Sequence, residues 1–323
     1  MATGGSASGG ARTGGAATGG SGQGGSASGG SGRDAGRADG PGATGGTVST
    51  GGNQGSGGAR DAAVPDLGPD TAGASTLPPV TDYSAAGPFA TVTDKNVGPG
   101  NGYTVYRPKT LGENGLLHAP IIFGPGIGMQ VSQMSGMLLN FASHGFVVVG
   151  TPVLNGGPND PNNKSAMIKG LDWIIAQNSQ PGTYEGKLDV KHAISMGYSV
   201  GGTAAVEVGA HEAVATTVSI HGHTATSALH GPMLQTSGTK DTVGLPMQQK
   251  TYDSSKVQTF LATVKDADHG YIQNANGGVQ RPAIVAWMRY WIYNDQGGKN
   301  YFYGDDCVMC TAPWTNPQRK NWQ

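Results

Sequence analysis

A serine stands between glycines in the segment SMGYSVGG, in the pattern Gly-x-Ser-x-Gly. Ser199 lies where an apolar run, Val190–Met196, gives way to a run of small residues, Gly202–Gly209. A sharp strand-to-helix turn at such a point lifts a serine hydroxyl clear of the backbone, at the positive end of the helix. The strand and helix pass close together there, so the positions of Gly197 and Gly201 must be small. Because the chain has 57 glycines, the pattern could also arise by chance. The prediction of a strand-to-helix turn at Ser199 therefore depends on the strand and helix patterns on either side of it.

A serine hydroxyl needs a base and an orienting acid before it becomes a good nucleophile. His269, in KDADHGY, directly follows an apolar run, and Asp241, in SGTKDTVG, follows the preceding one. An aspartate in that place can accept the imidazole N–H and set its tautomer. Asp266 and Asp268 compete for this role, but they lie too near His269 in sequence to approach its ring easily from behind. We therefore expect Ser199, His269 and Asp241 to act as nucleophile, base and acid.

Acyl transfer also needs hydrogen-bond donors for the oxyanion that forms on the attacked carbonyl. One donor should be the backbone N–H of Val200, the residue directly after the serine. The second should come from the glycine-rich loop Gly124–Gly128, where the backbone can approach a substrate closely, and the Ile127 N–H is the expected donor.

These residues require a scaffold in which strands alternate with helices. The pattern predicts strands at Tyr103–Pro108, Ala119–Gly124, Phe146–Thr151, Val190–Met196, Val214–Ile220, Gly231–Gly238 and, as the last, Val257–Val264. It predicts helices at Met129–His144, Ser165–Gln177, Gly202–Gly209, Pro246–Tyr252 and, as the last, Val279–Tyr293. Alternation of this kind indicates an α/β fold with a doubly wound, mostly parallel sheet and helices on both faces. Such sheets bind ligands at the carboxyl ends of their strands.

The segment between Ile220 and Pro232 is short. It leaves too little chain for the helical lid that many lipases carry at this position. We therefore expect no lid domain and an open cleft over Ser199.

The first 80 residues differ in composition from the rest. They hold 26 of the 57 glycines and no Phe, Trp, Tyr or Ile. Such a segment cannot bury enough apolar surface to offset its chain entropy. We interpret residues 1–80 as a disordered Gly/Ser/Thr-rich tether and residues 81–323 as one catalytic domain.

The charge balance and hydropathy exclude some partner classes. The net charge is −1 and no basic stripe indicates nucleic-acid binding. No apolar run approaches the length of a membrane span. No leader is visible, but a long tether ahead of such a domain is typical of secreted or surface-anchored bacterial proteins, so we expect a secreted or cell-surface monomer.

Two groups of potential metal-binding or redox residues remain. Cys307 and Cys310 favour a small local disulfide, with free thiols or a redox pair as alternatives, because a zinc site needs about four ligands. His221, His223 and His230 follow a predicted strand. They could bind a metal, but we interpret them as polar groups that line or flank a cleft, and we expect neither metal nor cofactor.

The segments IIFGPGIG, FASHGFVVVGTP, GYSVGG, GTKDT, DADHG and VAWMRYWIYND follow one another in an order and spacing that resemble bacterial cutinases and polyester (PET) hydrolases. The resemblance covers roughly residues 83–312. It implies an α/β-hydrolase fold, secretion and metal-free serine-ester hydrolysis. It also implies Ser199, Asp241 and His269 as the catalytic residues, with Ile127 and Val200 at the oxyanion hole.

The chain departs from the family at several of these positions. The family usually has an aromatic residue at the position of Ile127, His or Trp at Tyr198, Met at Val200 and often Trp near His223. We expect Tyr198 and His223 to contact substrate. A short-chain esterase or lipase without polymer activity, or a non-catalytic surface-binding module, are the alternative functions.

Overall fold

The computed structural model describes residues 76–222, 224 and 228–322. All of them belong to one structural unit, Val64–Gln323. The predicted tether lies almost wholly outside the described residues. Within its last five positions, however, Leu77 is buried against the core, and the Pro78 carbonyl accepts a hydrogen bond from Arg289.

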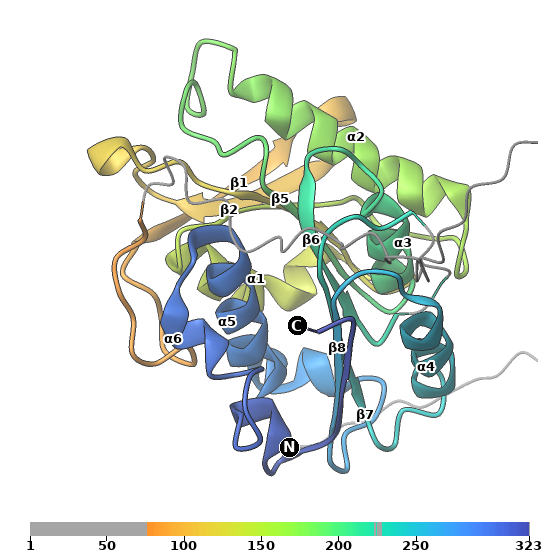
Figure 1. Cartoon of the computed structure of the whole chain (residues 1–323). Coiled ribbons are helices and arrows are strands. Elements are labelled where there is room, and N and C mark those ends of the chain that lie inside the picture. The colour runs from red at the N-terminus through yellow and green to blue at the C-terminus, as the bar shows by residue number, and fades with distance from the viewer. Residues whose placement is uncertain (1–75, 223, 225–227, 323) are drawn as a thin grey trace, which may run out of the picture. The chain divides into compact units, whose positions relative to one another are not determined.

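The described residues form a sheet of nine strands (Figure 1). The strands are β1 (Thr91–Val97), β2 (Tyr103–Pro108), β3 (Pro120–Gly124), β4 (Val147–Gly150), β5 (Ala193–Tyr198), β6 (Val214–Ile220), β7 (Met233–Gly238), β8 (Thr259–Val264) and β9 (Trp314–Lys320). Their spatial order is β1-β2-β4-β3-β5-β6-β7-β8-β9. The six central strands run parallel, and β1, β2 and β9 pair antiparallel at the two edges.

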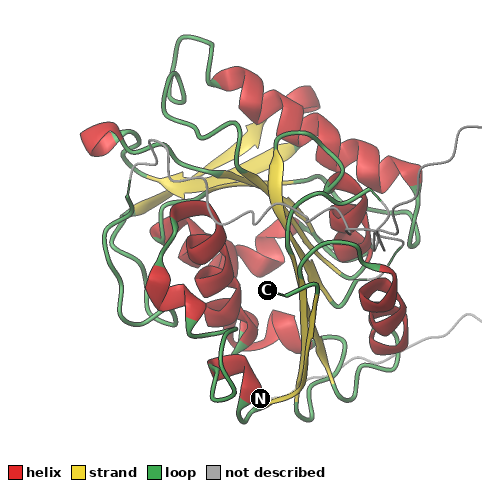
Figure 2. Ribbon diagram, viewed as in Figure 1, coloured by secondary structure: helices red, strands yellow, loops and turns green. Residues whose placement is uncertain are grey.

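Helices cover both faces of this sheet (Figure 2). The α-helices are α1 (Ser135–Ser143), α2 (Pro161–Gln177), α3 (Val200–Val208), α4 (Leu245–Ser254), α5 (Gln280–Tyr293) and α6 (Gln296–Lys299). Short 3₁₀ turns, η1 to η5, lie at Pro99–Asn101, Glu113–Gly115, Val131–Met134, Tyr271–Gly277 and Val308–Cys310. Helices α1 and α5 pack on one face, and α2 and α3 pack on the other. The predicted α/β fold with a doubly wound, mostly parallel sheet is confirmed.

The strand register lines up apolar side chains across the sheet. Phe123, Met196, Val218, Leu234 and Phe260 are neighbours on successive strands, and all are buried in the core cluster beneath α1 and α5. A second core cluster lies between the opposite face and α2 and α3. Strands buried on both faces read as continuous apolar runs, which is why the central ones were recognisable in the sequence.

The edges of the sheet differ from the sequence-based expectation. Val257–Val264 is not the last strand, because β9 pairs antiparallel with β8. Strand β1 was also not predicted, and α6 follows the helix expected to be last. Both missed strands are rich in polar residues and half-exposed at a sheet edge, so they lack the apolar run that marks the buried strands.

Two predicted helices have different starting points in the structure. The segment expected to be one helix from Met129 contains a 3₁₀ turn, Val131–Met134, before α1 begins. Helix α2 begins at Pro161 rather than Ser165, with the Asp160 side chain accepting a hydrogen bond from the Asn162 N–H. Proline at the first helical position and an aspartate cap are favourable helix starts.

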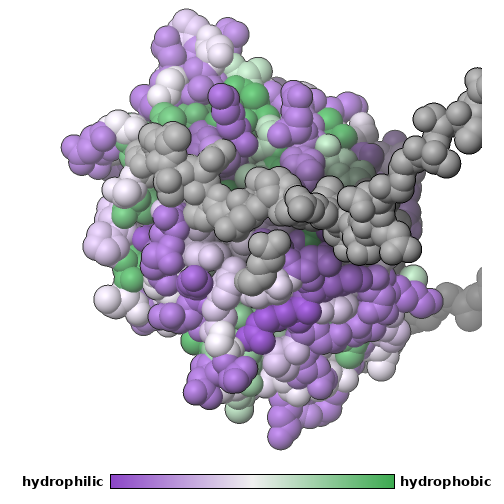
Figure 3. Space-filling view, viewed as in Figure 1, coloured by the Kyte–Doolittle hydropathy of each residue, from purple (hydrophilic) through white to green (hydrophobic). Residues whose placement is uncertain are grey.

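Hydrophilic residues predominate on the face drawn in Figure 3, with smaller groups of hydrophobic residues between them. Among the described residues, no helix combines the length and the apolar character needed to cross a membrane.

Candidate active site

Ser199 occupies a strained turn between β5 and α3. Strand β5 ends at Tyr198 and α3 begins at Val200, which leaves the serine with φ 55° and ψ −120°. Residues other than glycine rarely adopt such a backbone, and strain of this kind costs on the order of 1–3 kcal/mol. The Ser199 N–H donates to the Ile220 carbonyl at 2.9 Å, so the turn is fastened to the end of β6.

The glycines on either side of this turn are required by close backbone packing. A Cβ on Gly197 would lie 2.2 Å from the carbonyl oxygen of Gly201, and a Cβ on Gly201 would lie 2.0 Å from that of Gly124. Real Cβ contacts are not this short. The two glycines therefore let β5, α3 and the end of β3 approach closely enough to present the serine.

The side chains of Ser199, His269 and Asp241 form a continuous chain of hydrogen bonds. His269 Nε2 lies 2.9 Å from Ser199 Oγ, and His269 Nδ1 lies 3.1 Å from Asp241 Oδ1. An ionised carboxylate only accepts hydrogen bonds, so the imidazole proton is on Nδ1 and Nε2 accepts from the serine hydroxyl. The Asp241 side chain is 0% exposed, and that of His269 is 25% exposed. This arrangement leaves the serine poised for deprotonation.

Asp241 is held by donors on both of its oxygens. Besides His269, Oδ1 accepts from the Gly244 N–H at 2.7 Å, and Oδ2 accepts from Ser237 Oγ at 2.9 Å and His221 Nδ1 at 2.7 Å. Burial by itself would raise the pKa of Asp241. The hydrogen bonds from His221, His269 and Gly244 outweigh it and hold the pKa well below its usual range. The carboxylate is therefore charged at neutral pH.

His221 is a contributor to the site that sequence reasoning did not identify in this role. The sequence groups it with His223 and His230 as polar residues that line or flank a cleft. His221 does line a cavity that also contains Ser199, but it is buried and its ring contacts Asp241. His230 is exposed and bonds the His211 carbonyl, and His223 lies outside the described residues. The sequence feature that could have identified His221 was its position directly after β6, at the same edge of the sheet as the other site residues.

The ligand atoms of His221, Asp241 and His269 lie within 4.8 Å of one another, a grouping that could in principle hold a metal ion. Both imidazole Nδ1 atoms already donate to the Asp241 carboxylate. A metal in this place would have to displace both of those hydrogen bonds. The arrangement fits hydrogen bonding among the three groups better than metal ligation.

Tyr198, expected to contact substrate, lines the same cavity as Ser199, and 3% of its surface is exposed. Its ring lies beside that of His269, with the centroids 5.4 Å apart. The Tyr198 hydroxyl donates to the backbone carbonyl of His269 at 2.9 Å and accepts from Gln273 Nε2 at 3.0 Å. These contacts fasten the loop that carries His269.

The two expected oxyanion donors lie on the same cavity as Ser199. Val200 is the first residue of α3, and N–H groups in the first turn of a helix have no acceptor within that helix. Ile127 lies in the loop after β3, held by the Gly128 N–H, which donates to the Leu154 carbonyl at 2.8 Å. The Ile127 side chain is 53% exposed.

The cavity over Ser199 has a volume of about 530 Å³. Its wall includes the apolar side chains of Ile127, Met129, Pro158 and Val243. Among the described residues between β6 and β7, there is no helix and no strand that could serve as a lid. Such a cavity can admit an apolar ester, and Ser199 is among the residues that would contact it.

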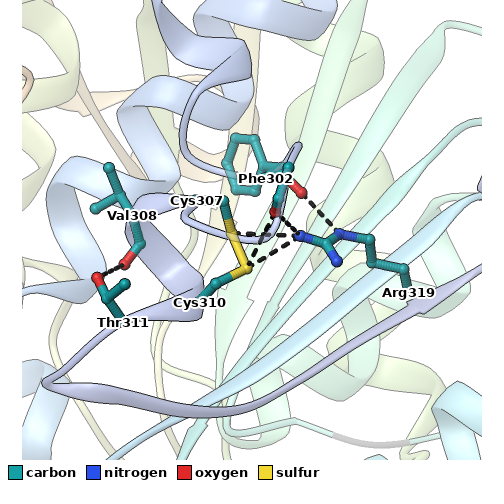
Figure 4. The surroundings of a disulfide bond; sticks show 7 residues. Phe302, Cys307, Val308, Cys310, Thr311 and Arg319 are labelled. Atoms are coloured by element: carbon teal, nitrogen blue, oxygen red, sulfur yellow. Dashed lines mark hydrogen bonds between the residues drawn. A yellow bond between two sulfur atoms is a disulfide. The ribbon is translucent and has the colours of Figure 1, made fainter.

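The disulfide lies apart from this cavity. Cys307 and Cys310 are bonded, as favoured from the sequence (Figure 4). Arg319 donates to Cys310 Sγ at 3.0 Å and to the Phe302 and Gly304 carbonyls. Arg319 pairs with Phe260 near the beginning of β8, whereas His269 follows the end of that strand. The disulfide therefore anchors β9 at the opposite end of β8 from the candidate site.

Comparison with known proteins agrees with this geometry. A family model described as PET hydrolase-like matches residues 61–314. That range is more than half of the chain and contains every site residue described above. No curated protein matched the chain. The turn at Ser199, the parallel sheet and the extent of this match lead to one conclusion: the chain belongs to the PET hydrolase-like family of α/β-hydrolases.

Proposed function

We propose that this protein is a secreted serine hydrolase that cleaves the carboxylic ester bonds of polyesters of the cutin or PET type. Family membership supports ester hydrolysis in general. The observation that carries the mechanism is the hydrogen-bond chain from Ser199 Oγ through His269 to Asp241.

In the proposed acylation step, Ser199 Oγ attacks the ester carbonyl carbon while His269 Nε2 takes the hydroxyl proton. Asp241 keeps the imidazole in the correct tautomer and stabilises the imidazolium that forms. The tetrahedral intermediate collapses by expelling the alcohol, which receives its proton from His269. An acyl-enzyme on Ser199 remains.

Deacylation repeats this chemistry with water as the nucleophile. His269 Nε2 accepts a proton from water, and the hydroxide attacks the acyl carbon. Ser199 then leaves and regains its proton from His269, which releases the acid. In both steps the N–H groups of Val200 and Ile127 donate to the oxyanion, and one such donor contributes roughly a hundred- to a thousandfold in kcat.

The openness and the apolar lining of the cavity support the proposal of a bulky, apolar substrate. The site is open to solvent in the described structure, and several apolar side chains form its wall. A polymer segment has to reach the serine while the rest of the chain stays outside, which a closed lid would prevent. A short-chain esterase with no polymer activity is the alternative that the experiment must separate.

Export and the monomeric state are also part of the proposal. A disulfide between Cys307 and Cys310 suits an oxidising compartment, because cytosolic thiols are kept reduced. Recovery of the protein from the culture medium with this disulfide intact would support export. A molecular mass near 32.7 kDa in solution would support a monomer.

The test compares wild type with Ser199→Ala on nitrophenyl esters of increasing acyl length and on polyester film. We expect the variant to lose at least about a thousandfold in kcat, because triad deletions remove the nucleophile and not the fold. Wild type should release soluble product from the film.

Three results would change the proposal. Activity on soluble esters without release from film would support the short-chain esterase. Unchanged turnover in Ser199→Ala would contradict a serine mechanism. Absence of any turnover, with no labelling of Ser199 by a serine-directed phosphonate, would favour a non-catalytic surface-binding module.

A further inference from the structure

A second imidazole contacts Oδ2 of Asp241, the carboxylate oxygen that does not face His269. His221 follows β6 directly, its side chain is 0% exposed, and its Nδ1 lies 2.7 Å from Asp241 Oδ2. The corresponding contact between His269 Nδ1 and Oδ1 is 3.1 Å. The carboxylate is thus shared between two histidines, and the contact of the buried one is shorter.

Gln280 contacts the other nitrogen of this second ring. Its amide Nε2, at the start of α5, lies 3.1 Å from His221 Nε2, and both side chains are buried. The Asp241 carboxylate only accepts hydrogen bonds, so the His221 Nδ1–H is directed at it. The His221 ring is therefore held at both of its nitrogens.

His221 is not a substitute for His269 as the base. Its Nε2 is engaged by Gln280, and the Ser199 hydroxyl is bonded to His269 instead. The His221 and His269 rings meet edge to face, with their centroids 5.5 Å apart. Only 1% of His221 is exposed, so it offers a substrate almost no contact surface.

We propose that His221 is a positioning residue for the serine hydrolase reaction. It holds Oδ2 of Asp241 so that Oδ1 faces His269, and its hydrogen bond withdraws negative charge from the carboxylate. This inference rests on the proposed function. Ser237 supports the same oxygen, but a hydroxyl can rotate, whereas the His221 ring is fixed at both nitrogens. Loss of His221 would leave Oδ2 of the carboxylate held by the Ser237 hydroxyl, and therefore less firmly.

The charge effect has a defined direction. Among the described residues, the titratable groups that face His221 are Asp241, His269 and Tyr198. The Gln280 and Ser237 side chains and the N–H groups of Val243 and Gly244, which also contact His221 or Asp241, carry no charge. Without the His221 N–H, the Asp241 carboxylate is more basic and stabilises the imidazolium form of His269 more strongly. His269 then stays protonated, and unable to act as the base, up to a higher pH. As the pH is lowered, activity is therefore lost at a higher pH than in the wild type.

The experiment compares His221→Leu, which removes the donor, with His221→Asn, whose amide Nδ2 can take the place of Nδ1 and donate to Asp241. His230→Leu is the matched control, because His230 is an exposed histidine of the same β6–β7 connection, and the hydrogen bond that it makes to the described residues is to the backbone carbonyl of His211. For each variant, kcat, KM and the pH profile of kcat/KM on a soluble nitrophenyl ester are measured together with the melting temperature.

We expect His221→Leu to lose about tenfold or more in kcat with little change in KM, since a hydrogen bond to a charged group is lost. The acid limb of its kcat/KM profile should move upward by about half a pH unit. His221→Asn should restore kcat to within about threefold of wild type and return the acid limb. His230→Leu should behave as wild type.

Several outcomes would overturn the role of His221. These are a wild-type kcat and pH profile in His221→Leu, an acid limb that stays in place while stability and kcat fall together, or no rescue by His221→Asn. Ser199→Ala, assayed alongside, separates the two proposals: unchanged activity there contradicts the serine mechanism, whereas the outcomes above contradict only the role of His221.

A proton NMR measurement on the wild type covers the case in which His221→Leu does not fold. A buried imidazole N–H bonded to a carboxylate gives a strongly deshielded, slowly exchanging signal. We expect one such signal that persists in His269→Ala and disappears in His221→Asn. Its absence from wild type would contradict a hydrogen bond from His221 Nδ1–H to Asp241.

Discussion

At the scale of single residues, the site depends on how its polar groups are held as much as on which groups are present. The Asp241 carboxylate accepts five hydrogen bonds, from His269, His221, Ser237 and the N–H groups of Val243 and Gly244. A buried charge is tolerated only when its lone pairs are satisfied in this way. The same contacts fix the direction in which the carboxylate meets the imidazole.

Tyr198 holds the other side of that imidazole, and Tyr198→Phe tests this role. The substitution removes the hydrogen bond to the His269 carbonyl and leaves the ring in place. We expect kcat to fall about three- to tenfold with KM nearly unchanged, since a buried neutral hydrogen bond is worth about 1 kcal/mol. Steady-state kinetics on a soluble ester measures both parameters.

Tyr103→Phe is the matched control. The Tyr103 hydroxyl also donates to a backbone carbonyl, that of Ala166 at 2.8 Å, but Tyr103 lies on β2, away from the site. It should lower the melting temperature by a similar amount without lowering kcat. If both variants keep wild-type kcat, Tyr198 does not position His269.

At the scale of elements, the parallel sheet collects the site residues at one edge. Ser199, His221, Asp241 and His269 follow the ends of β5, β6, β7 and β8, four strands that are neighbours in this order. Parallel strands end on the same side, so groups from distant parts of the chain meet there. The close approach of β5 and α3 then fixes the position of Ser199 at this edge.

This close approach is tested by Gly201→Ala. The added methyl would meet the Gly124 carbonyl oxygen at 2.0 Å, so α3 must move away from the loop after β3. We expect a destabilisation of about 2 kcal/mol or more and a loss of at least about tenfold in kcat, because a shift of the turn would move Ser199, the proposed nucleophile, relative to His269. Thermal unfolding and ester hydrolysis measure the two effects.

Gly157→Ala serves as the comparison. A Cβ at Gly157 has no atom within 4 Å, so the variant should match wild type in both measurements. Wild-type activity and stability in Gly201→Ala would show that the turn does not need the glycine.

At the scale of the whole molecule, one edge of the sheet is held by contacts outside the candidate site. Strand β9 closes one edge, and Arg319 links it to the Cys307–Cys310 disulfide and to the Phe302 carbonyl. Phe302 packs on Trp287 of α5 in the larger core cluster. Through Arg319, the disulfide and Phe302 are therefore linked to β9 beside the beginning of β8, whereas His269 follows the end of β8.

Removal of the disulfide, as Cys307→Ser with Cys310→Ser, should separate stability from activity. The two cysteines are three residues apart, so they close a very small loop, and its loss costs about 2 kcal/mol by chain entropy. We expect a lower melting temperature and unchanged kcat at 25 °C. A fall in kcat comparable to that of Tyr198→Phe would show that β9 influences the site.

The sequence determined the local features of this protein. The glycines around Ser199 define a strand-to-helix turn, and continuous apolar runs define strands buried on both faces, because backbone sterics and burial act on neighbouring residues. The positions of Asp241 and His269 after such runs predicted that they would reach Ser199, and the structure places the three side chains in hydrogen-bond contact.

Only the tertiary structure decided which groups meet across strands. Neither the shared use of Asp241 by His221 and His269 nor the pairing of the polar strand β9 with β8 has a local signature. Both depend on strand order and on distances between segments far apart in the chain. Periodicity along a sequence reports which side of an element is buried, not which element lies beside it.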